Sequence, residues 1–381
     1  MNKSSDILKL DSLRLRKHVM PFNPLFGVPN DPHSFFLNIS GIRKTYLPVA
    51  MKNEKLIKEL TKHKSLASFI RSSYFKSVFG KVSTFFLSLK ELRLKYDFFF
   101  WIHEKVDFHF PFNSAISLIR DLQYSRWSRS PLNLIIRKNH NQDTSTIVLL
   151  FIIWFKTYSD VNNNVLTVSP SELISKKYKN ICLGLYENNR SPELCFLKTD
   201  YSFLLSHPYS KSKLWFLSSF SPEKCRGLDF SVIYFSDMGK WPDTKINPVS
   251  KFISAAFPVI NHRRSNLIII ESGSHRSDHA FAKELKAAQE NISPFKIINV
   301  PWFDDKDKIF PFDSDKDKLD FFFNLFKFRN HKSLPHFPRA SGEYLYSQWN
   351  KGLPLEALHW FATESSYYKT KSKFYNHFPP V

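Results

Sequence analysis

From about residue 100 onward, short β-like runs alternate with longer segments that have helical patterns. Several of these runs are apolar on both faces, which is typical of strands in a parallel sheet covered by helices. The expected strands are 132–136, 164–169, 214–219, 229–236, 266–272 and 295–303, and the expected helices include 145–157 and 278–291. Because strands that alternate with helices favour an open sheet, we predict an α/β fold with a mostly parallel sheet flanked by helices.

The two ends of the sequence differ from this central part. Residues 1–95 are basic and carry helical stretches, whereas residues 304–381 begin with a charged loop and continue with helical patterns. We therefore expect three segments: a basic, largely helical N-terminal extension (1–95), an α/β core (96–303) and a helical C-terminal subdomain (304–381).

Positive charge is concentrated in the first quarter of the chain. The net charge is +21, and residues 1–100 hold 18 Lys/Arg against 7 Asp/Glu, a net charge of +11. A basic surface favours polyanions, with nucleic acid as the first expectation and an anionic membrane surface as the second. A solvated basic surface without a partner remains the alternative.

Cysteine spacing and hydropathy exclude several classes of protein. Cys182, Cys195 and Cys225 form no C-x-x-C pair, so we expect neither a disulfide framework nor a zinc site. The first residues lack the apolar core of a signal peptide. The longest apolar run, Ile147 to Phe155, has nine residues, less than half of a membrane span, so we expect no membrane segment.

Three polar loops follow expected strands, at 137–146, 236–243 and 272–277. In open α/β sheets, ligands bind beyond the carboxyl ends of the strands, so these loops are expected to line one crevice.

The first of these loops has part of the chemistry of a phosphate-binding loop. Such a loop wraps backbone N–H groups around phosphates and adds a Lys for charge and a Ser or Thr hydroxyl for Mg²⁺. Lys138, Ser145 and Thr146 supply the last two parts, but the loop has no glycine and Asp143 adds a negative charge. Taken alone, the segment fits a plain strand–helix loop better.

An acidic residue stands close to the start of each of the other two loops. An apolar strand that ends in Asp237 resembles a strand whose acidic end holds Mg²⁺ and orients an attacking water. Glu271 ends the next buried run. Each feature alone also fits an ordinary strand end followed by a polar turn.

The order of several short motifs is more specific than any one of them. Seven short segments are similar, in this order along the chain, to seven motifs of one family. They are 97–101 (D-x-x-F-W), 226–230 (R-G-x-D-[YF]), 236–241 (S-E-V-G-x-W), 271–273 (E-S-T), 301–303 (P-W-[YF]), 342–345 (G-E-Y-L) and 355–360 (L-E-A-I-x-W). Together they resemble the ATPase half of phage terminase large subunits, the motors that package double-stranded DNA into procapsids. Residues 1–95 carry none of these motifs.

This resemblance implies a P-loop NTPase-like core and a role for each polar residue. Lys138 would bind phosphate, with His140 in the place of an expected Arg and with Ser145 and Thr146 completing the nucleotide site. The same resemblance implies that Ser145 and Asp237 hold Mg²⁺ and that Asp237 orients the attacking water. It also implies that Glu271 couples hydrolysis to movement, and that Arg226 stabilises transferred charge in a neighbouring subunit.

The sequence departs from the family at the same site. Asp143 and Thr144 replace the expected glycines, Asp237 replaces a catalytic Glu, and His140 is mostly neutral at pH 7. The sequence also ends at Val381 without a nuclease segment, so we expect no DNA cleavage by that route. Two hypotheses stay open: a packaging ATPase with impaired hydrolysis, and a non-catalytic descendant that binds DNA or protein, such as a prophage remnant.

The resemblance also implies cofactors and partners. They are ATP and Mg²⁺ for an active enzyme, double-stranded DNA, a portal protein, a small terminase subunit and further copies of the chain in a ring. The expected location is the cytoplasm of a host cell.

Overall fold

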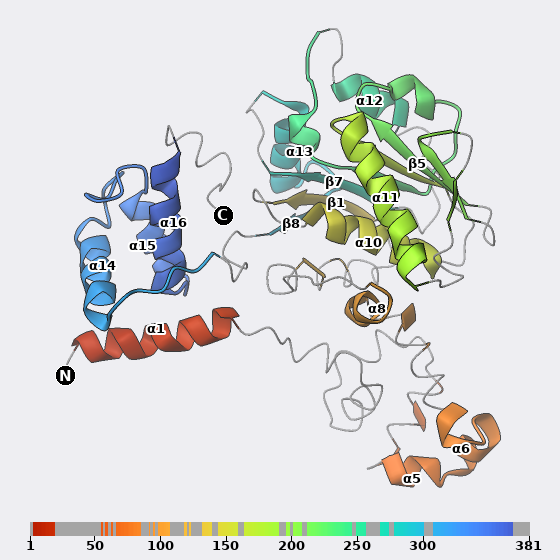
Figure 1. The fold of residues 1–381 in the computed structure, drawn as a ribbon, viewed down its shortest axis with the longest axis horizontal. Helices are drawn as coiled ribbons and strands as arrows, with labels where there is room; N and C mark the ends of the chain where they lie inside the picture. Colours follow the sequence, from red (N-terminus) through yellow and green to blue (C-terminus); the bar gives the residue numbers. More distant parts are fainter. Residues whose placement is uncertain are drawn as a thin grey trace.

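The computed structural model describes an α/β unit, a helical C-terminal unit and parts of the N-terminal segment (Figure 1). The described residues are 3–19, parts of 55–106, 118–119, 122, and 132–368 with gaps at 139–143, 159–163, 190–195, 199–200, 208–211, 246–248, 257–266, 274–277 and 301–307.

An eight-stranded sheet forms the centre of the α/β unit, in the order β3-β4-β5-β2-β6-β7-β1-β8. The strands from β5 to β8 in this order are parallel, and β4 and β3 are added antiparallel at one edge. The bounds are β1 Leu132–Arg137, β2 Val165–Ser169, β3 Leu197–Lys198, β4 Leu204–Ser206, β5 Lys213–Ser218, β6 Val232–Phe235, β7 Leu267–Ser272 and β8 Lys296–Asn299. The predicted fold class is confirmed, and each of the six predicted strands matches a strand of the sheet. Two of them are shorter than predicted: 229–236 is a strand only at 232–235, and 295–303 only at 296–299, with residues 301–303 outside the described residues. β3 and β4 were not predicted, because a strand of two or three residues is too short to show a hydrophobic pattern.

Helices cover both faces of the sheet. The apolar side chains of β1 alternate between them: Leu134 and Ile136 pack with α8, α10 and α11, and Ile135 packs with α12 and α13. The bounds are α8 Phe98–Lys105, α10 Thr144–Thr157, α11 Glu172–Asn189, α12 Val249–Ala256 and α13 Ala280–Gln289. The helices predicted at 145–157 and 278–291 are therefore confirmed. Because the strands are buried on both faces of the sheet, their sequences are continuous runs of apolar residues.

Trp154 in α10 joins the segment before the sheet to the core. Its indole Nε1 donates a hydrogen bond of 2.8 Å to the Leu94 carbonyl, and its ring lies 5.1 Å from that of Phe98. A buried Trp needs such a partner for its N–H group. Trp154 therefore has a packing role and lies in the core.

Three helices form the C-terminal unit around a separate apolar core: α14 Asp315–Lys327, α15 Gly342–Asn350 and α16 Leu355–Tyr367. The N-terminal helix α1, Lys3–Val19, lies against this unit and not against the sheet (Figure 1). The division of the sequence into three segments did not predict this pairing between the two ends of the described chain.

Asp11 is the centre of the contact between α1 and the C-terminal unit. Its Oδ1 accepts a hydrogen bond of 2.9 Å from the Leu355 backbone N–H, in the first turn of α16. Its Oδ2 lies 2.6 Å from the Lys318 ammonium, which also pairs with Glu356 at 2.8 Å. Because Pro354 at the N-cap of α16 has no side chain that can accept a hydrogen bond, Asp11 supplies the cap from a distant helix.

This contact predicts a pH dependence of stability. Burial raises the pKa of Asp11 to about 6, although the Lys318 ammonium opposes the shift. The folded chain therefore holds this proton more tightly than the unfolded chain, whose Asp has an ordinary pKa. It follows that the contribution of Asp11 to the free energy of unfolding falls as the pH rises from about 4 to about 6 and is constant above that range.

Urea unfolding of wild type and Asp11→Asn between pH 4 and pH 7 measures this effect. The stability difference, wild type minus variant, should decrease across the window at up to about 1.4 kcal/mol per pH unit. The Lys318 ammonium stays charged over this range, because its carboxylate partners outweigh burial and raise its pKa. A difference that is independent of pH would contradict the prediction.

Candidate functional site

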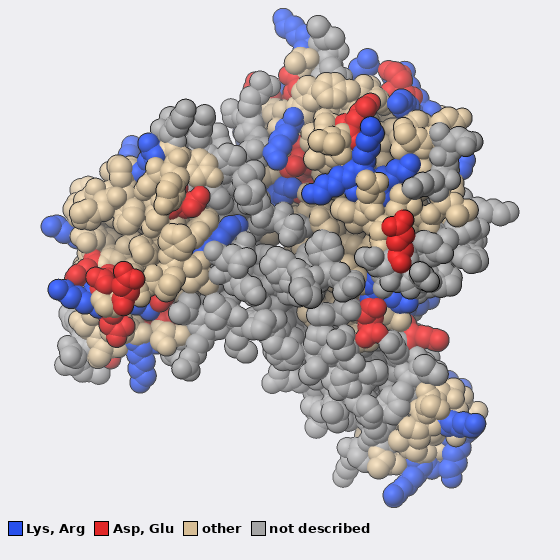
Figure 2. All heavy atoms as spheres, in the orientation of Figure 1, with Lys and Arg blue, Asp and Glu red and all other residues tan. Residues whose placement is uncertain are grey.

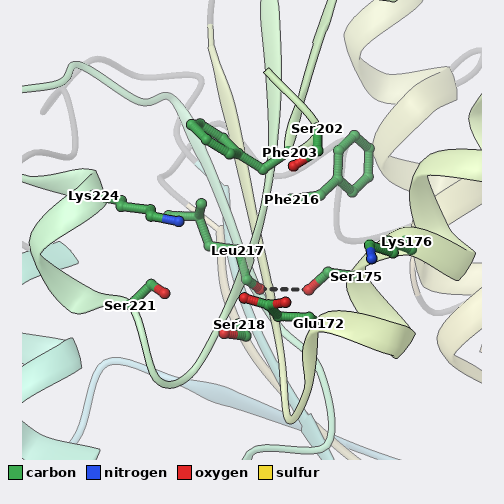
Figure 3. A pocket seen from close by; sticks show the side chains of 10 residues that line it. All are labelled: Glu172, Ser175, Lys176, Ser202, Phe203, Phe216, Leu217, Ser218, Ser221 and Lys224. Carbon is green, nitrogen blue, oxygen red and sulfur yellow. Dashed lines mark hydrogen bonds between the residues drawn. The ribbon is translucent and has the colours of Figure 1, made fainter. Parts of the chain in front are cut away.

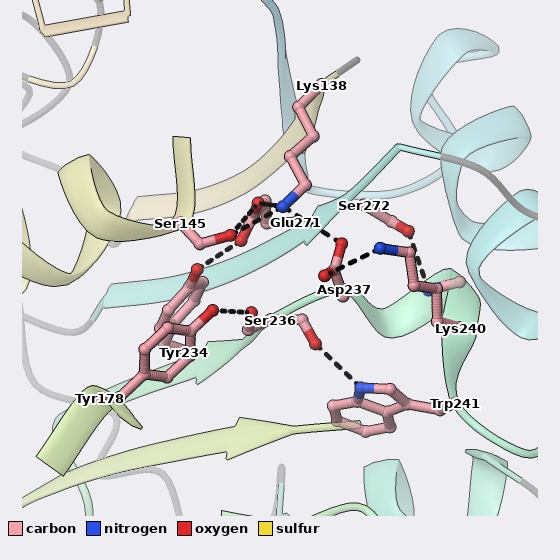
Figure 4. A network of polar contacts seen from close by, with 11 residues as sticks. Lys138, Ser145, Tyr178, Tyr234, Ser236, Asp237, Lys240, Trp241, Glu271 and Ser272 are labelled. Carbon is pink, nitrogen blue, oxygen red and sulfur yellow. Dashed lines mark hydrogen bonds and ion pairs between the residues drawn. The ribbon is translucent and has the colours of Figure 1, made fainter. Parts of the chain in front are cut away.

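Three adjacent parallel strands end at one place on the carboxyl edge of the sheet. Strand β7 lies between β1 and β6, with Ile136 paired to Glu271 and Phe235 paired to Ile270. Lys138 follows β1 directly, and its backbone N–H donates to the Ser272 carbonyl at 3.1 Å. Asp237 follows β6 by two residues. The three loops that were expected to line one crevice thus begin side by side, and their polar side chains meet (Figure 4).

Lys138 is the centre of this cluster. Its buried ammonium pairs with Glu271 Oε1, lies 3.1 Å from Asp237 Oδ1, and donates to Ser145 Oγ at 2.7 Å. Burial alone would lower the pKa of Lys138, but the two carboxylates, with Glu271 the stronger, raise it above its ordinary value. Lys138 is therefore charged throughout the physiological range.

Glu271 is fully buried and contacts three side chains. Oε1 accepts hydrogen bonds from Lys138 and from the Ser145 hydroxyl, the latter at 2.8 Å, and Oε2 accepts one from the Tyr234 hydroxyl. Burial and the nearby Glu271 carboxylate hold the pKa of Tyr234 well above its usual range, so Tyr234 remains a donor. A buried carboxylate is stable only with such partners.

Asp237 has a left-handed backbone conformation, with φ 46° and ψ 41°. Asp and Asn adopt this region more readily than other residues with a side chain, which gives a local reason for Asp rather than Glu at the start of the turn Met238–Lys240. Burial would raise the pKa of Asp237, but Lys138 and then Lys240, 3.2 Å from Oδ2, lower it. Asp237 is therefore ionised.

Hydrogen bonds to the neighbouring loops hold these side chains in place. The Gly239 backbone N–H donates to Ser272 Oγ at 3.0 Å, and the Trp241 indole donates to the Ser236 carbonyl at 2.9 Å. The Ser236 hydroxyl is 2.6 Å from that of Tyr178. Ser236, Trp241 and Ser272, which the motif matches had identified, therefore position the loop that carries Asp237 against the end of β7, which carries Glu271.

Asp243 connects the same loop to two helices. Its Oδ1 accepts from the Val249 backbone N–H and its Oδ2 from that of Ala280, both at 3.1 Å, so one carboxylate caps α12 and α13. The pKa of Asp243 is lowered, because these backbone hydrogen bonds outweigh the effect of burial. Sequence reasoning missed this residue, since its two partners are distant in the chain.

The other predicted site residues differ in their positions. Thr146 is buried in the first turn of α10, next to Ser145. Arg226 lies apart from the cluster: it is exposed, and its guanidinium pairs with Glu223 at 3.0 Å. His140 lies outside the described residues. Tyr234 and Tyr178 were missed, although a Tyr within the apolar strand 232–235 was a visible signal.

The cluster offers the oxygen ligands that Mg²⁺ prefers. They are the Ser145 hydroxyl and the carboxylates of Asp237 and Glu271. Among the described residues, no group of three or more His, Cys, Asp or Glu side chains could hold a metal ion alone. Mg²⁺ commonly uses one or two carboxylates together with substrate phosphates, so the residues present fit Mg²⁺ bound with a nucleotide. The buried Thr144 hydroxyl, which has no hydrogen-bond partner among the residues that the structure describes, adds a further polar atom at the start of α10.

A separate cavity of about 140 Å³ lies between α11 and the turn after β5 (Figure 3). Its wall includes Lys176, Lys224, Glu172 and Phe216. None of the residues of the Lys138 cluster lines it, so this cavity is not the candidate nucleotide site.

Among the helices that the structure describes, none combines the length and the apolar composition that a membrane crossing requires.

Comparison with known proteins gives similarities in fold only. No protein-family model matches the sequence, and no curated protein matches it. Among solved structures, the chain is similar to the large terminase of bacteriophage HK97, with 12% identity, a TM-score of 0.41, and coverage of 63% of this chain and 49% of that one. It is similar to the large terminase of the thermophilic bacteriophage D6E, with 10% identity, a TM-score of 0.40, and coverage of 55% and 49%. It is also similar to the large terminase ATPase domain of Thermus phage P74-26, with 12% identity, a TM-score of 0.34, and coverage of 47% and 79%. The match thus spans about half the length of the first two terminases.

Proposed function

We propose that the chain is the ATPase part of a terminase large subunit, which uses ATP to package viral double-stranded DNA. The observation that supports this most is the convergence of Lys138, Ser145, Asp237 and Glu271 at the carboxyl ends of β1, β6 and β7. A buried ammonium, a hydroxyl at the start of a helix and two carboxylates are the groups that phosphoryl transfer requires. The motif order in the sequence supports the same function.

In this proposal, each residue acts on a bound nucleotide. Lys138 binds the phosphates, Ser145 and Asp237 hold Mg²⁺, and Thr146 completes the nucleotide site with His140. Mg²⁺, when bound, neutralises charge that develops on the transferred phosphoryl group. Asp237 orients the attacking water, and Glu271, which is held by Lys138, Ser145 and Tyr234, transmits the change in phosphate contacts to β7.

The charge balance of the cluster supports a second candidate function. Lys138 and Lys240 are matched by Asp237 and Glu271, so the four side chains have no net charge. An incoming triphosphate must therefore replace a carboxylate as the partner of Lys138, which lowers nucleotide affinity. This favours a non-catalytic descendant of a terminase that binds DNA or protein without turnover of ATP.

The proposed assembly follows from the same function. Copies of the chain form a ring on a portal protein in the host cytoplasm, and a small terminase subunit presents the DNA. The exposed Arg226 then acts in the site of a neighbouring copy, which agrees with its exposure and with its pairing to Glu223 rather than to a residue of the cluster. The segments 1–95, 96–303 and 304–381 are the proposed functional divisions.

DNA-stimulated ATP hydrolysis by the purified chain tests the proposal, with Asp237→Ala as the comparison. Because ~1 Å of misplacement at a reacting centre can lower a rate about 100-fold, removal of the Asp237 carboxylate should reduce turnover at least that much. Calorimetry with millimolar ATP and Mg²⁺ separates the two candidates. Binding without turnover supports the non-catalytic descendant, and no binding contradicts the ATPase.

A further inference from the structure

A small helical unit in the N-terminal segment has no role in the nucleotide cluster. It contains α5, Leu66–Ile70, and α6, Ser73–Val78, and it lies far from the sheet (Figure 1). Its core is aromatic: Phe69 and Phe75 are buried with their rings 5.5 Å apart, and the rings of Phe79 and His63 pack against them.

The turns of this unit are well defined. The Ser72 hydroxyl caps α6 by accepting a hydrogen bond of 3.1 Å from the Phe75 N–H. Gly80 ends the helical segment in the left-handed region, with φ 67°, which residues with a side chain rarely adopt. The exposed side chains on either side of these turns, at Arg71, Lys76 and Lys81, therefore have a fixed spacing.

The surface of the unit is strongly basic. Residues 55–84 contain seven Lys/Arg and one Asp/Glu. The single acidic residue, Glu59, is neutralised by Lys62 at 2.5 Å. Arg71, Lys76 and Lys81 are exposed, and none of them forms an ion pair with an acidic side chain of the described residues. On the visible face of this lobe, at the lower right of Figure 2, the charged side chains are Lys or Arg.

The position of the aromatic rings indicates the kind of polyanion. Binding of single strands depends on exposed aromatic side chains that stack on bases. In the described part of residues 55–84, the large apolar side chains that are exposed are Val78 and Val82, whereas Phe69 and Phe75 are buried and Tyr74 and Phe79 are partly buried. A basic surface without a fully exposed aromatic ring fits the phosphate backbone of a duplex better than the bases of a single strand.

We propose that residues 55–84 bind the phosphate backbone of double-stranded DNA through Arg71, Lys76 and Lys81, independently of the nucleotide cluster. The choice of DNA as the duplex rests on the proposed packaging function. The binding unit itself rests on charge and packing, so it gives residues 55–84 a role that the ATPase motifs do not assign.

Fluorescence anisotropy with a 30-base-pair DNA duplex, on the order of three helical turns, tests the proposal without ATP. The full chain is compared with Arg71→Gln/Lys76→Gln/Lys81→Gln between about 50 and 300 mM salt. If each side chain contacts one phosphate, the slope of log K against log salt concentration should decrease in magnitude by about 2.7, and the affinity near 0.1 M salt should fall on the order of 10- to 100-fold.

Lys286→Gln/Lys296→Gln/Lys316→Gln is the matched control, because it removes the same charge from exposed positions elsewhere. Unchanged binding by the first triple variant, or equal losses in both, would overturn the proposal, as would tighter binding of single-stranded DNA or of an RNA duplex. A loss of binding in the first variant with ATP affinity unchanged supports it. DNA binding is measured without nucleotide, so its result does not depend on whether the chain hydrolyses ATP. Failure of the ATPase proposal and failure of this proposal can therefore be distinguished.

Discussion

Lys138→Met is expected to lower the free energy of unfolding by about 3–5 kcal/mol, because it removes the cation from a buried cluster and leaves Glu271 without a counter-charge. Met keeps most of the length of the Lys side chain and leaves little empty space. The expected loss of stability therefore comes from the missing charge and hydrogen bonds more than from a cavity. Denaturant unfolding of wild type and variant measures the difference.

The double variant Lys138→Met/Glu271→Gln provides the control. It removes both charges of the pair, while Asp237 keeps Lys240 as a partner. Replacing both partners of a buried ion pair is far less costly than removing one, so the double variant should be more stable than Lys138→Met alone, with a coupling of about 1–3 kcal/mol. Additive losses would show that the two side chains do not stabilise each other.

Gly342→Ala is expected to be the second severe change. A Cβ atom at Gly342 would lie 2.2 Å from the backbone carbonyl oxygen of Phe328 and 3.3 Å from that of His331. Backbone atoms cannot rotate away, so α15 must move relative to the end of α14. We expect a loss of stability at or above the usual ~1–3 kcal/mol of an overpacked core.

Gly184→Ala, inside helix α11, is the matched control for this substitution. A Cβ atom there meets nothing within 4 Å. Alanine favours a helix over glycine by about 0.5–1 kcal/mol, so this variant should be slightly more stable than wild type. Thermal unfolding of both variants should therefore give melting temperatures that change in opposite directions, and similar changes would contradict the steric argument.

Much of the α/β unit was predictable from the sequence because parallel strands buried on both faces form continuous apolar runs. The same reasoning placed Lys138, Asp237 and Glu271 close together, since each lies at or just after the carboxyl end of a predicted strand and these ends meet at one edge of a parallel sheet. The strands β3 and β4 were too short to detect, and Arg226 follows a more distant strand of the sheet, β5.

The partners of the site residues were less predictable. Tyr234 donates to Glu271 across 37 positions in the sequence, and Ser145 donates to it across 126. Strand periodicity shows that Tyr234 is buried but not which buried group its hydroxyl reaches. Asp243, with backbone partners in two helices, was missed for the same reason.

The sequence by itself determined the α/β class, the six strands of the parallel part of the sheet, and which polar residues stand at their carboxyl ends, because local hydrophobic patterns record how each segment is buried. Only the tertiary structure decided that Lys138 is neutralised by Asp237 and Glu271, and that Asp11 caps α16 from the other end of the chain. Both depend on polar groups that are distant in sequence coming within about 3 Å of each other, the range of a hydrogen bond or close ion pair. Such contacts are set by how strands and helices pack, and no local pattern records them.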